Sequence, residues 1–275
     1  MQKSPDVRRK STQPNPDTIV TSNLYYEQPL NERIRTFLRL EKLFQQFAFH
    51  VEQGSEWNHP IAIESIIDLI NFTTRSDIKL ETMKELERQH ARLERLIKRP
   101  QIDQQQLGAL LKNIEERIQD LKSNNGQLGQ ELLQTELLSS IRQKSSLPGC
   151  ICSFDLPVYT FWLNQPESVR RQHLEQWFAP FAILDRSVQL ILDVLRYSVD
   201  DTDEVAVNGF FQMAIETSKV AQLLRIAVPE HSDCYPEISA GKHRFSVRFM
   251  SNKNPSSRPE QYQQDINFKL GMCAF

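Results

Sequence analysis

The sequence predicts an α+β fold in which helices predominate. Across most of residues 31–199, apolar side chains recur at every third or fourth position, which is the period of helices with one face in a core. After residue 205, apolar and polar residues alternate instead, as they do in strands of an antiparallel sheet. Because the two patterns occupy separate parts of the chain, we expect a helical domain joined to a smaller β-domain.

The N-terminal region predicts a tail, then a strand, then the first helix. Residues 1–23 are polar and contain Pro5, Pro14 and Pro16. They lack the apolar surface that would offset the entropy of ordering, so we predict a disordered tail. The apolar residues at 24–26 predict a short strand within residues 24–30, the first segment of the β-domain. Asn31 is expected to cap the first helix, and Pro60 is expected to begin the second.

Two long helices, over residues 77–98 and 103–121, are predicted to form an α-hairpin. Each carries apolar residues in near-heptad order, running from Leu80 to Ile97 in the first helix, and Asp103 is expected to cap the second. The short connection makes the two helices antiparallel neighbours, and we expect the pair to project from the body. Further helices are predicted at residues 130–144, 158–163, 166–178 and 181–197, so that the helical domain comprises residues 31–146 and 157–199.

The remaining segments predict the β-domain. Residues 150–155 are predicted to form a strand. The acidic run at residues 200–204 lacks the glycine and the ligand spacing of a calcium loop, so we interpret it as a solvated turn between a helix and a strand. One antiparallel sheet should follow, with strands at 210–215, 223–228, 244–250 and 266–270. We therefore assign residues 147–156 and 205–275 to the β-domain.

Composition argues against most chemical functions. The chain has only eight glycines and no glycine-rich phosphate loop, and its four cysteines match no strong zinc spacing. No histidine has a recognisable nucleophile partner, so we predict that the protein is not an enzyme and needs no cofactor or metal. A formal net charge of −2 gives no overall attraction to nucleic acid or membrane. Because no apolar run has the length of a membrane span, a cytoplasmic location is expected.

The predicted strand at residues 242–250 carries the strongest functional signal. Its apolar residues alternate with Arg244, Ser246 and Arg248, so one face enters a core and the two arginines share the other. Lys242 lies just before them, and residues 238–259 contain no Asp or Glu. Arginine forks bind carboxylates bidentately, which favours an acidic peptide or a C-terminal carboxylate as the partner. Pairing with acidic residues elsewhere in the chain, or binding of nucleic acid, remain alternative interpretations.

Four segments, taken together and in order, resemble the ZapD family of bacterial cell division proteins. They are PLNERIRTFLRLE at 29–41, LPGCICSFDLP at 147–157, YPEISAGKHRFSVRFM at 235–250 and FKLGMC at 268–273. The resemblance covers about nine-tenths of the chain. It implies a non-enzymatic cytoplasmic homodimer that cross-links and bundles filaments of the tubulin-like protein FtsZ in the Z-ring at midcell, without direct membrane contact. It also implies a β-domain that draws on N-terminal, central and C-terminal strands.

The resemblance further implies a binding site for the C-terminal tail of FtsZ. Carried over by position, Arg244 and Arg248 match the basic pair of the family's strand, with Lys242 beside them. Arg75, Lys79 and Arg225 match further basic positions, and the resemblance implies that Arg75 joins the strand arginines in one groove. Two departures stand out: residues 1–23 form a longer tail, and Glu136 lies where a more basic helix is expected, which leaves a charge-based dimer contact there open. A nucleic-acid-binding or other adaptor module is the alternative function.

Overall fold

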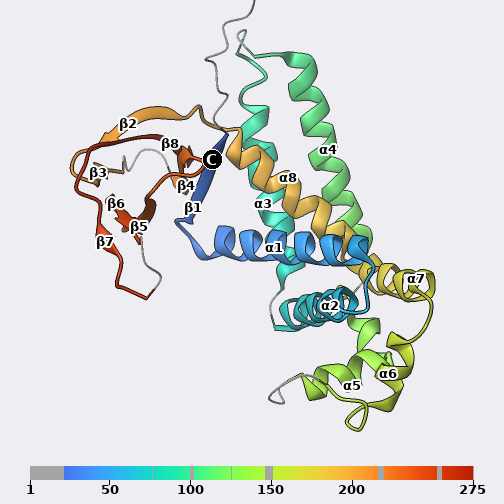
Figure 1. Ribbon diagram of the computed structural model, residues 1–275. Coiled ribbons are helices and arrows are strands. Elements are labelled where there is room, and N and C mark those ends of the chain that lie inside the picture. Colours follow the sequence, from blue (N-terminus) through green and yellow to red (C-terminus); the bar gives the residue numbers. More distant parts are fainter. Residues whose placement is uncertain are drawn as a thin grey trace, which may run out of the picture.

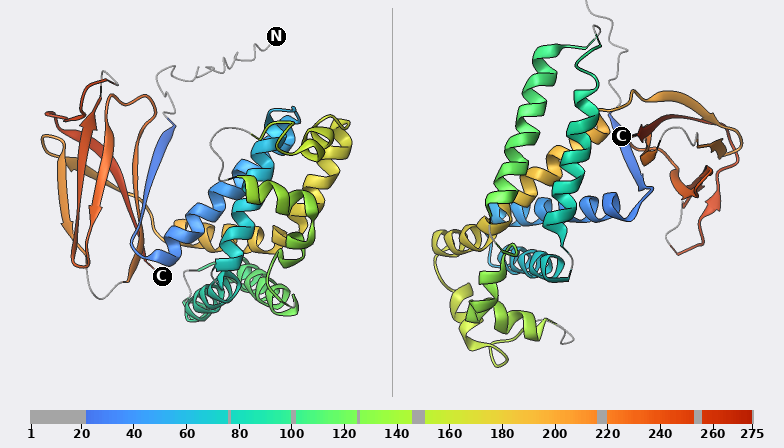
Figure 2. Two further views of the ribbon diagram at one scale, coloured as in Figure 1. Left: turned by 90° about the horizontal axis from the view of Figure 1, so that it is seen from below. Right: turned by 180° about the vertical axis from the view of Figure 1, so that it is seen from behind.

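The computed structural model describes residues 22–75, 77–99, 102–124, 126–145, 151–215, 220–252 and 256–274. It confirms a mainly helical α+β fold with antiparallel sheets. A helical lobe and a β-lobe lie side by side, joined where the first strand passes into the first helix and where the last helix approaches the last strand (Figures 1 and 2). Most of the predicted tail, residues 1–21, lies outside the described residues.

The helices begin and end close to the predicted positions. The side chain of Asn31 accepts a hydrogen bond from the Ile34 amide at 2.9 Å, which confirms the predicted cap. Asp103 likewise accepts bonds from the amides of Gln105 and Gln106. The helical elements are α1 (Glu32–Gln53), α2 (Asn58–Arg75), α3 (Ile78–Glu94), α4 (Gln104–Ser123), α5 (Glu136–Lys144), α6 (Pro157–Leu163), α7 (Glu167–Phe178) and α8 (Ala182–Arg196), with 3₁₀ turns η1 (Gln130–Gln134) and η2 (Ala179–Phe181).

The hairpin of α3 and α4 projects from the helical lobe, and α8 packs across both of its helices (Figure 1). The predicted apolar stripe of α3 is wrong at its ends, because Leu80 and Ile97 are 40% and 48% exposed. Leu86 and Leu93 of the stripe are buried as predicted, and the buried face also includes the polar side chains of Thr82, Glu85 and Gln89. Gln89 donates a hydrogen bond to the Ile191 carbonyl of α8 at 3.1 Å, so packing against α8 selected this face.

The β-lobe contains two facing sheets where one was predicted. One sheet has the order β1-β4-β8-β2 and the other β3-β6-β5, with β7 on β6. Leu224 and Ile226 of one sheet share a core with Phe245 and Val247 of the other. The strands are β1 (Asn23–Pro29), β2 (Thr202–Ala206), β3 (Phe210–Ala214), β4 (Ala221–Pro229), β5 (Tyr235–Ala240), β6 (Arg244–Ser251), β7 (Glu260–Gln261) and β8 (Ile266–Ala274).

Two of the sequence interpretations need correction. Part of the acidic run, predicted as a turn, belongs to β2, where Asp203 pairs in register with Lys269 of β8. Residues 151–155, predicted as part of a central strand, form a turn without strand pairing. The Asp155 carboxylate accepts a hydrogen bond from the Cys152 amide at 3.0 Å, and this local bond replaces a bond to a neighbouring strand. Residues 146–150 lie outside the described residues.

A buried arginine ties α7 to the junction of α1 and α2. Arg170 donates to His59 Nδ1 at 2.8 Å and to the carbonyls of Leu163, Gln165 and Gly54. Burial, together with the Arg170 charge, lowers the pKa of His59 below its ordinary value of 6.5. His59 is therefore held neutral in the folded protein.

This arrangement predicts that stability falls as the pH drops below 6.5. In that range the unfolded chain takes up a proton on His59 that the folded chain resists, so acid favours unfolding. Between pH 7 and 5.5 we expect the free energy of unfolding, measured by urea denaturation, to fall by no more than the limit for one proton, about 1.4 kcal/mol per pH unit. A His59→Gln variant should lose this part of the pH dependence. If the free energy of unfolding of that variant falls with pH as steeply as that of the unmodified protein, His59 is not the group responsible.

Candidate functional site

The exposed face of β6 presents two arginines as predicted. Phe245, Val247 and Phe249 are buried, whereas Arg244 and Arg248, which alternate with them along the strand, are exposed. Within the described residues neither guanidinium takes part in an ion pair. Lys242 is exposed in the turn between β5 and β6. The rigid sheet therefore holds a cationic surface whose charges are available to a partner.

The strands beside β6 complete this surface. Phe210 of β3 and Glu237 of β5 lie directly opposite Arg248 in the two ladders, and Ala214 lies opposite Arg244. Opposed residues on one sheet face have Cβ atoms about 5 Å apart, so Glu237 and Phe210 flank the Arg248 side chain. The sequence analysis did not include Glu237, because this residue lies just before residues 238–259, which contain no Asp or Glu. Only the register of β5 against β6 reveals it.

Arg225 occupies a different place from the β6 arginines. It lies on β4, where its Nε is 3.3 Å from the Glu27 carboxylate and its guanidinium stacks 4.3 Å from the centre of the Tyr25 ring. Arg196 of α8 binds the same Glu27, and also Glu41 of α1, through two bidentate forks with N–O distances of 2.6–2.9 Å. The Arg225 charge is thus already compensated inside the junction of the two lobes.

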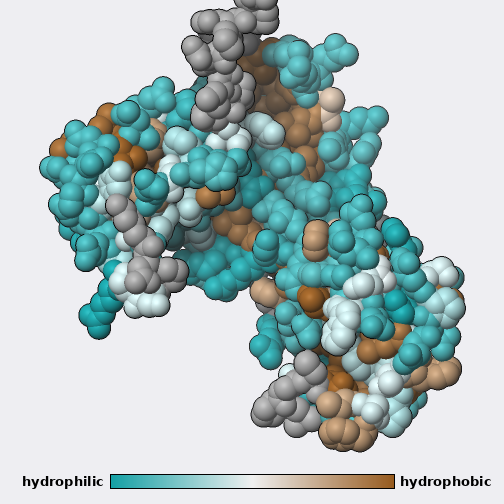
Figure 3. All heavy atoms as spheres, viewed as in Figure 1, coloured by the Kyte–Doolittle hydropathy of each residue, from teal (hydrophilic) through white to brown (hydrophobic). Residues whose placement is uncertain are grey.

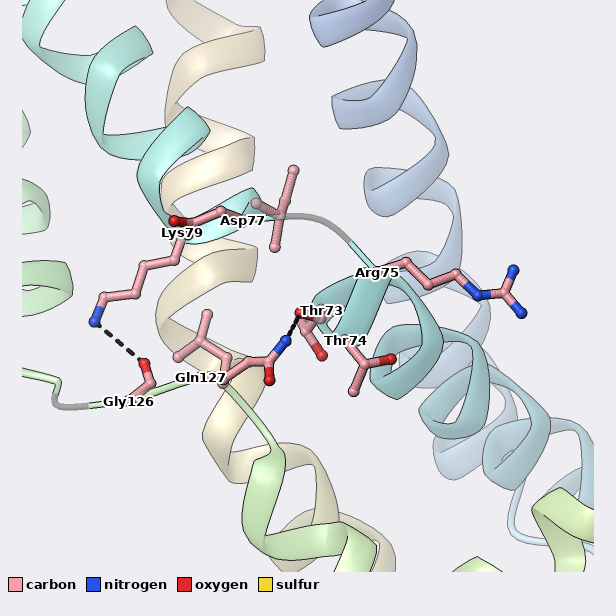
Figure 4. A pocket seen from close by; sticks show the side chains of 9 residues that line it. Thr73, Thr74, Arg75, Asp77, Lys79, Gly126 and Gln127 are labelled. Carbon is pink, nitrogen blue, oxygen red and sulfur yellow. Dashed lines mark hydrogen bonds between the residues drawn. The ribbon is translucent and has the colours of Figure 1, made fainter.

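Arg75 and Lys79 flank a hollow of about 420 Å³ at the end of α2 (Figure 4). The ammonium group of Lys79 donates to the carbonyls of Asn124 and Gly126, so it closes the turn after α4. The exposed Arg75 side chain extends in another direction, away from Lys79 (Figure 4). The two residues therefore belong to one neighbourhood, but their charged groups do not converge.

Arg75 also borders a second hollow of about 730 Å³ beside α1. This hollow contains Arg33, Arg39 and Lys84, which sequence reasoning did not assign, although both arginines lie in the segment 29–41 that carries the family resemblance. Acidic side chains from Glu32, Asp68 and Glu81 line it as well, so its charge is mixed. Neither hollow beside Arg75 includes a residue of β6. Arg75 and the β6 arginines belong to different lobes (Figure 1).

Among the described residues, no group of three or more His, Cys, Asp or Glu side chains could hold a metal ion. Burial raises the pKa of the Cys273 thiol to about 11, so this cysteine is not a thiolate near neutral pH. None of the helices in the described ranges has the length and apolarity to cross a membrane. What the surface of β6 can do is bind carboxylates through charge-assisted hydrogen bonds.

Known proteins resemble this chain over most of its length. The family model for ZapD, described as a cell division protein, matches residues 38–248. A ZapD of Methylococcus capsulatus is 37% identical over 252 residues, covering 92% of this chain and 98% of the relative. The ZapD proteins of Nitrosomonas europaea and an Azoarcus species are 34% and 36% identical, over 94% and 90% of this chain and 98% of each relative. The chain therefore belongs to the ZapD family of cell division proteins.

Proposed function

We propose that this protein is a cell division factor that binds the C-terminal tail of FtsZ and, as a dimer, cross-links FtsZ filaments in the Z-ring. The observation that carries the proposal is the pair of exposed arginines on β6, whose guanidinium groups make no ion pair within the described residues. Membership of a family of cell division proteins supports it. On this proposal the protein acts in the cytoplasm at midcell and performs no catalysis of its own.

The geometry of β6 suits an extended acidic peptide. Arg244 and Arg248 are four residues apart on a strand, which separates them by roughly 13 Å. An extended peptide that carries carboxylates about four residues apart could meet both guanidinium groups. Lys242 adds charge at one end of the pair, and Phe210, which is 38% exposed, offers an apolar contact beside Arg248. Arg75 contributes at a second contact, on the helical lobe.

Two binding sites per dimer would turn a weak contact into a strong cross-link. When both sites of a dimer engage neighbouring tails along filaments, the second binding event occurs at a high effective concentration. Bundling then follows from avidity, without nucleotide hydrolysis by this protein. Because the contact depends on exposed charges, it should weaken as salt is added.

Co-sedimentation with FtsZ tests the proposal. Filaments of intact FtsZ should carry this protein into a low-speed pellet, whereas filaments that lack the C-terminal tail should not. Raising the ionic strength about sixfold, from about 0.05 to about 0.3 M salt, should release most of the bound protein. If the protein sediments equally with intact FtsZ and with FtsZ that lacks the tail, the C-terminal tail is not the ligand of this site. Retardation of an oligonucleotide at physiological salt would favour the nucleic-acid alternative instead.

A further inference from the structure

The strand β3 lies at the margin of its sheet, and one of its edges is open. Within the described residues it pairs with β6 on one side, while a single bridge between Val207 and Phe210 joins it to β2 on the other. Beyond this bridge, no pairing between β2 and β3 occurs in the part of the chain that the structure describes. An open edge presents a row of backbone N–H and C=O groups to which another strand can bond.

The backbone groups of Gln212 and Ala214 face this open edge. The Ile215 amide donates a hydrogen bond to the His243 carbonyl at 2.8 Å, just before β6. Residues along an antiparallel strand alternate between bonding to the neighbouring strand and facing away from it, so the odd-numbered residues of β3 bond to β6. Gln212 and Ala214 therefore direct their N–H and C=O groups outward, where the described residues provide no backbone partner.

The open edge lacks the features that normally prevent strand pairing. Natural edges are protected by charged residues or proline, and residues 205–215 contain neither. Apolar side chains are exposed here instead: Val205, Val207 and Phe210 are 47%, 59% and 38% exposed. Figure 3 shows brown side chains at the surface of the β-lobe in the region where β2 and β3 lie in Figure 1. Exposed apolar surface beside unpaired backbone groups is typical of a site that receives a peptide strand.

The β6 arginines lie one strand away from this edge. Arg248 is directly opposite Phe210, and Arg244 is directly opposite Ala214. A strand added to β3 lies two strand spacings, about 10 Å, from β6, and extended arginine and glutamate side chains together span that separation. The single methyl group of Ala214 leaves the way from Arg244 to the edge open. Carboxylates that lie opposite Phe210 and Ala214 on an added strand can therefore meet both guanidinium groups.

The other side of β6 is less suited to an acidic peptide. The Gly241 amide donates to the Arg244 carbonyl at 2.9 Å, so the even-numbered residues of β5 face away from β6. One of them is Pro236, which has no N–H to donate. Glu237 lies opposite Arg248 on the same sheet face, so its carboxylate repels an acidic peptide on that side. The strand β1 also approaches β5. These features direct an acidic peptide to β3.

Charge also argues against a second copy of this chain as the occupant. Two β3 edges paired about a two-fold axis bring Arg244 and Arg248 of both copies onto one sheet face, where like charges repel. A peptide with alternating acidic and apolar residues fits better. Its acidic side chains point outward to the arginines. Its apolar side chains point inward to Met213 and Ile215, which are only partly buried against the core between the sheets.

We propose that the C-terminal tail of FtsZ binds as an additional strand along the open edge of β3. This inference rests on the proposed function and specifies the pose of the tail at that site. The backbone of Gln212 and Ala214 supplies hydrogen bonds that do not depend on the peptide sequence. The β6 arginines then select peptides with carboxylates about four residues apart.

Proline substitution at Gln212 tests the edge by fluorescence anisotropy with a fluorescent FtsZ tail peptide. The Gln212 N–H faces outward, so Gln212→Pro removes a donor to the peptide and none to β6. This variant should bind the peptide at least about tenfold more weakly than Gln212→Ala, which keeps the N–H. The matched control is Ala240→Pro, at an outward-facing position of β5, which should bind as the unmodified protein does. Equal affinities of Gln212→Pro and Gln212→Ala, or an equal loss in Ala240→Pro, would overturn the proposal.

Methylated peptides test the same edge with the unmodified protein, so the result does not depend on the folding of a variant. Alternate amides of an added strand face β3, and the others face away. N-methylation of one alternate set of tail amides should abolish binding, whereas N-methylation of the other set should preserve it. If the two sets of methyl groups have equal effects, the tail does not bind as a strand on this edge.

A designed peptide distinguishes failure of this inference from failure of the proposed function. A short acetylated peptide of alternating Glu and Val carries the required chemistry without the FtsZ sequence. If this peptide binds and Gln212→Pro weakens it, while the tail peptide does not bind, FtsZ is the wrong ligand and the edge stands. If the tail peptide binds through Arg244 and Arg248 but equally to Gln212→Pro, the proposed function stands and the strand pose is wrong. If neither peptide binds the unmodified protein, both are overturned.

Discussion

Replacing both Arg244 and Arg248 by Glu is expected to abolish FtsZ bundling while the fold remains intact. Both side chains are exposed and make no ion pair within the described residues, so their replacement breaks no ion pair of the β-lobe. A charge-assisted hydrogen bond contributes about 1.5–3 kcal/mol where it is desolvated. Two such bonds correspond to more than about a hundredfold in affinity, and the introduced carboxylates add repulsion. Fluorescence anisotropy with an FtsZ tail peptide measures the affinity, and light scattering measures bundling.

The control for this substitution separates a local site from overall charge. The double reversal makes the formal net charge more negative by four, from −2 to −6. Reversing Lys112 on α4 and Arg171 on α7 changes the net charge equally, at exposed positions in the helical lobe. That variant should bundle filaments normally. If both variants lose bundling to the same extent, the long-range field and not the β6 surface is responsible. Undiminished bundling by the β6 variant would refute the site.

Replacing Arg196 by Met is expected to cause a large loss of stability. Its guanidinium joins Glu27 of β1 to Glu41 of α1 through two bidentate forks, and the three side chains are only 15–20% exposed. Those hydrogen bonds also raise the pKa of Arg196, so it stays charged. Removing one partner of a largely buried ion pair costs about 3–5 kcal/mol, because the remaining charges lose their compensation. For a protein of this size, the melting temperature should fall by roughly 6–15 °C.

The exposed Arg171–Glu175 pair provides the comparison. Its side chains are 46% and 58% exposed, so Arg171→Met should lower the free energy of unfolding far less than Arg196→Met does. Neutralising Glu41 as well, in Arg196→Met with Glu41→Gln, should restore part of the lost stability, while Glu27 keeps Arg225 as its partner. Differential scanning calorimetry measures all of these variants. If Arg196→Met lowers the melting temperature no more than Arg171→Met does, the ion pair of Arg196 does not stabilise the junction of the two lobes.

The sequence predicted most of the helices because their signals are local. The cap at Asn31 depends on a side chain and an amide three residues later, and the helices over 31–53 and 182–196 show their buried faces in their own periodicity. The stripe of α3 was predicted less well. Its buried face includes Glu85 and Gln89, whose burial depends on partners in distant segments. Because helix faces are predicted from recurring apolar residues, a buried face that contains polar residues is not recognised.

The β-lobe was predicted less completely, because pairing between strands is not local. Residues 223–228 of β4 are largely buried on both faces, since Leu223 packs into the helical core while Leu224 joins the core between the sheets. A near-continuous apolar run identifies such a strand without showing that it separates two cores. The acidic residues of β2 gave no strand signal. Its pairing with β8 supplied the backbone hydrogen bonds that define it.

The order of residues was enough to predict that Arg244 and Arg248 share one exposed face of a strand. The period of two follows from backbone geometry within a few residues, and Phe245, Val247 and Phe249 fix which face is buried. Which of the charged side chains form ion pairs became clear only from the folded arrangement of the chain. It brought Glu27 to Arg225 and Arg196, placed Glu237 beside Arg248, and left the β6 arginines without an ion pair within the described residues. The physical reason is that charge interactions depend on distance through space, which the order of residues along the chain does not specify.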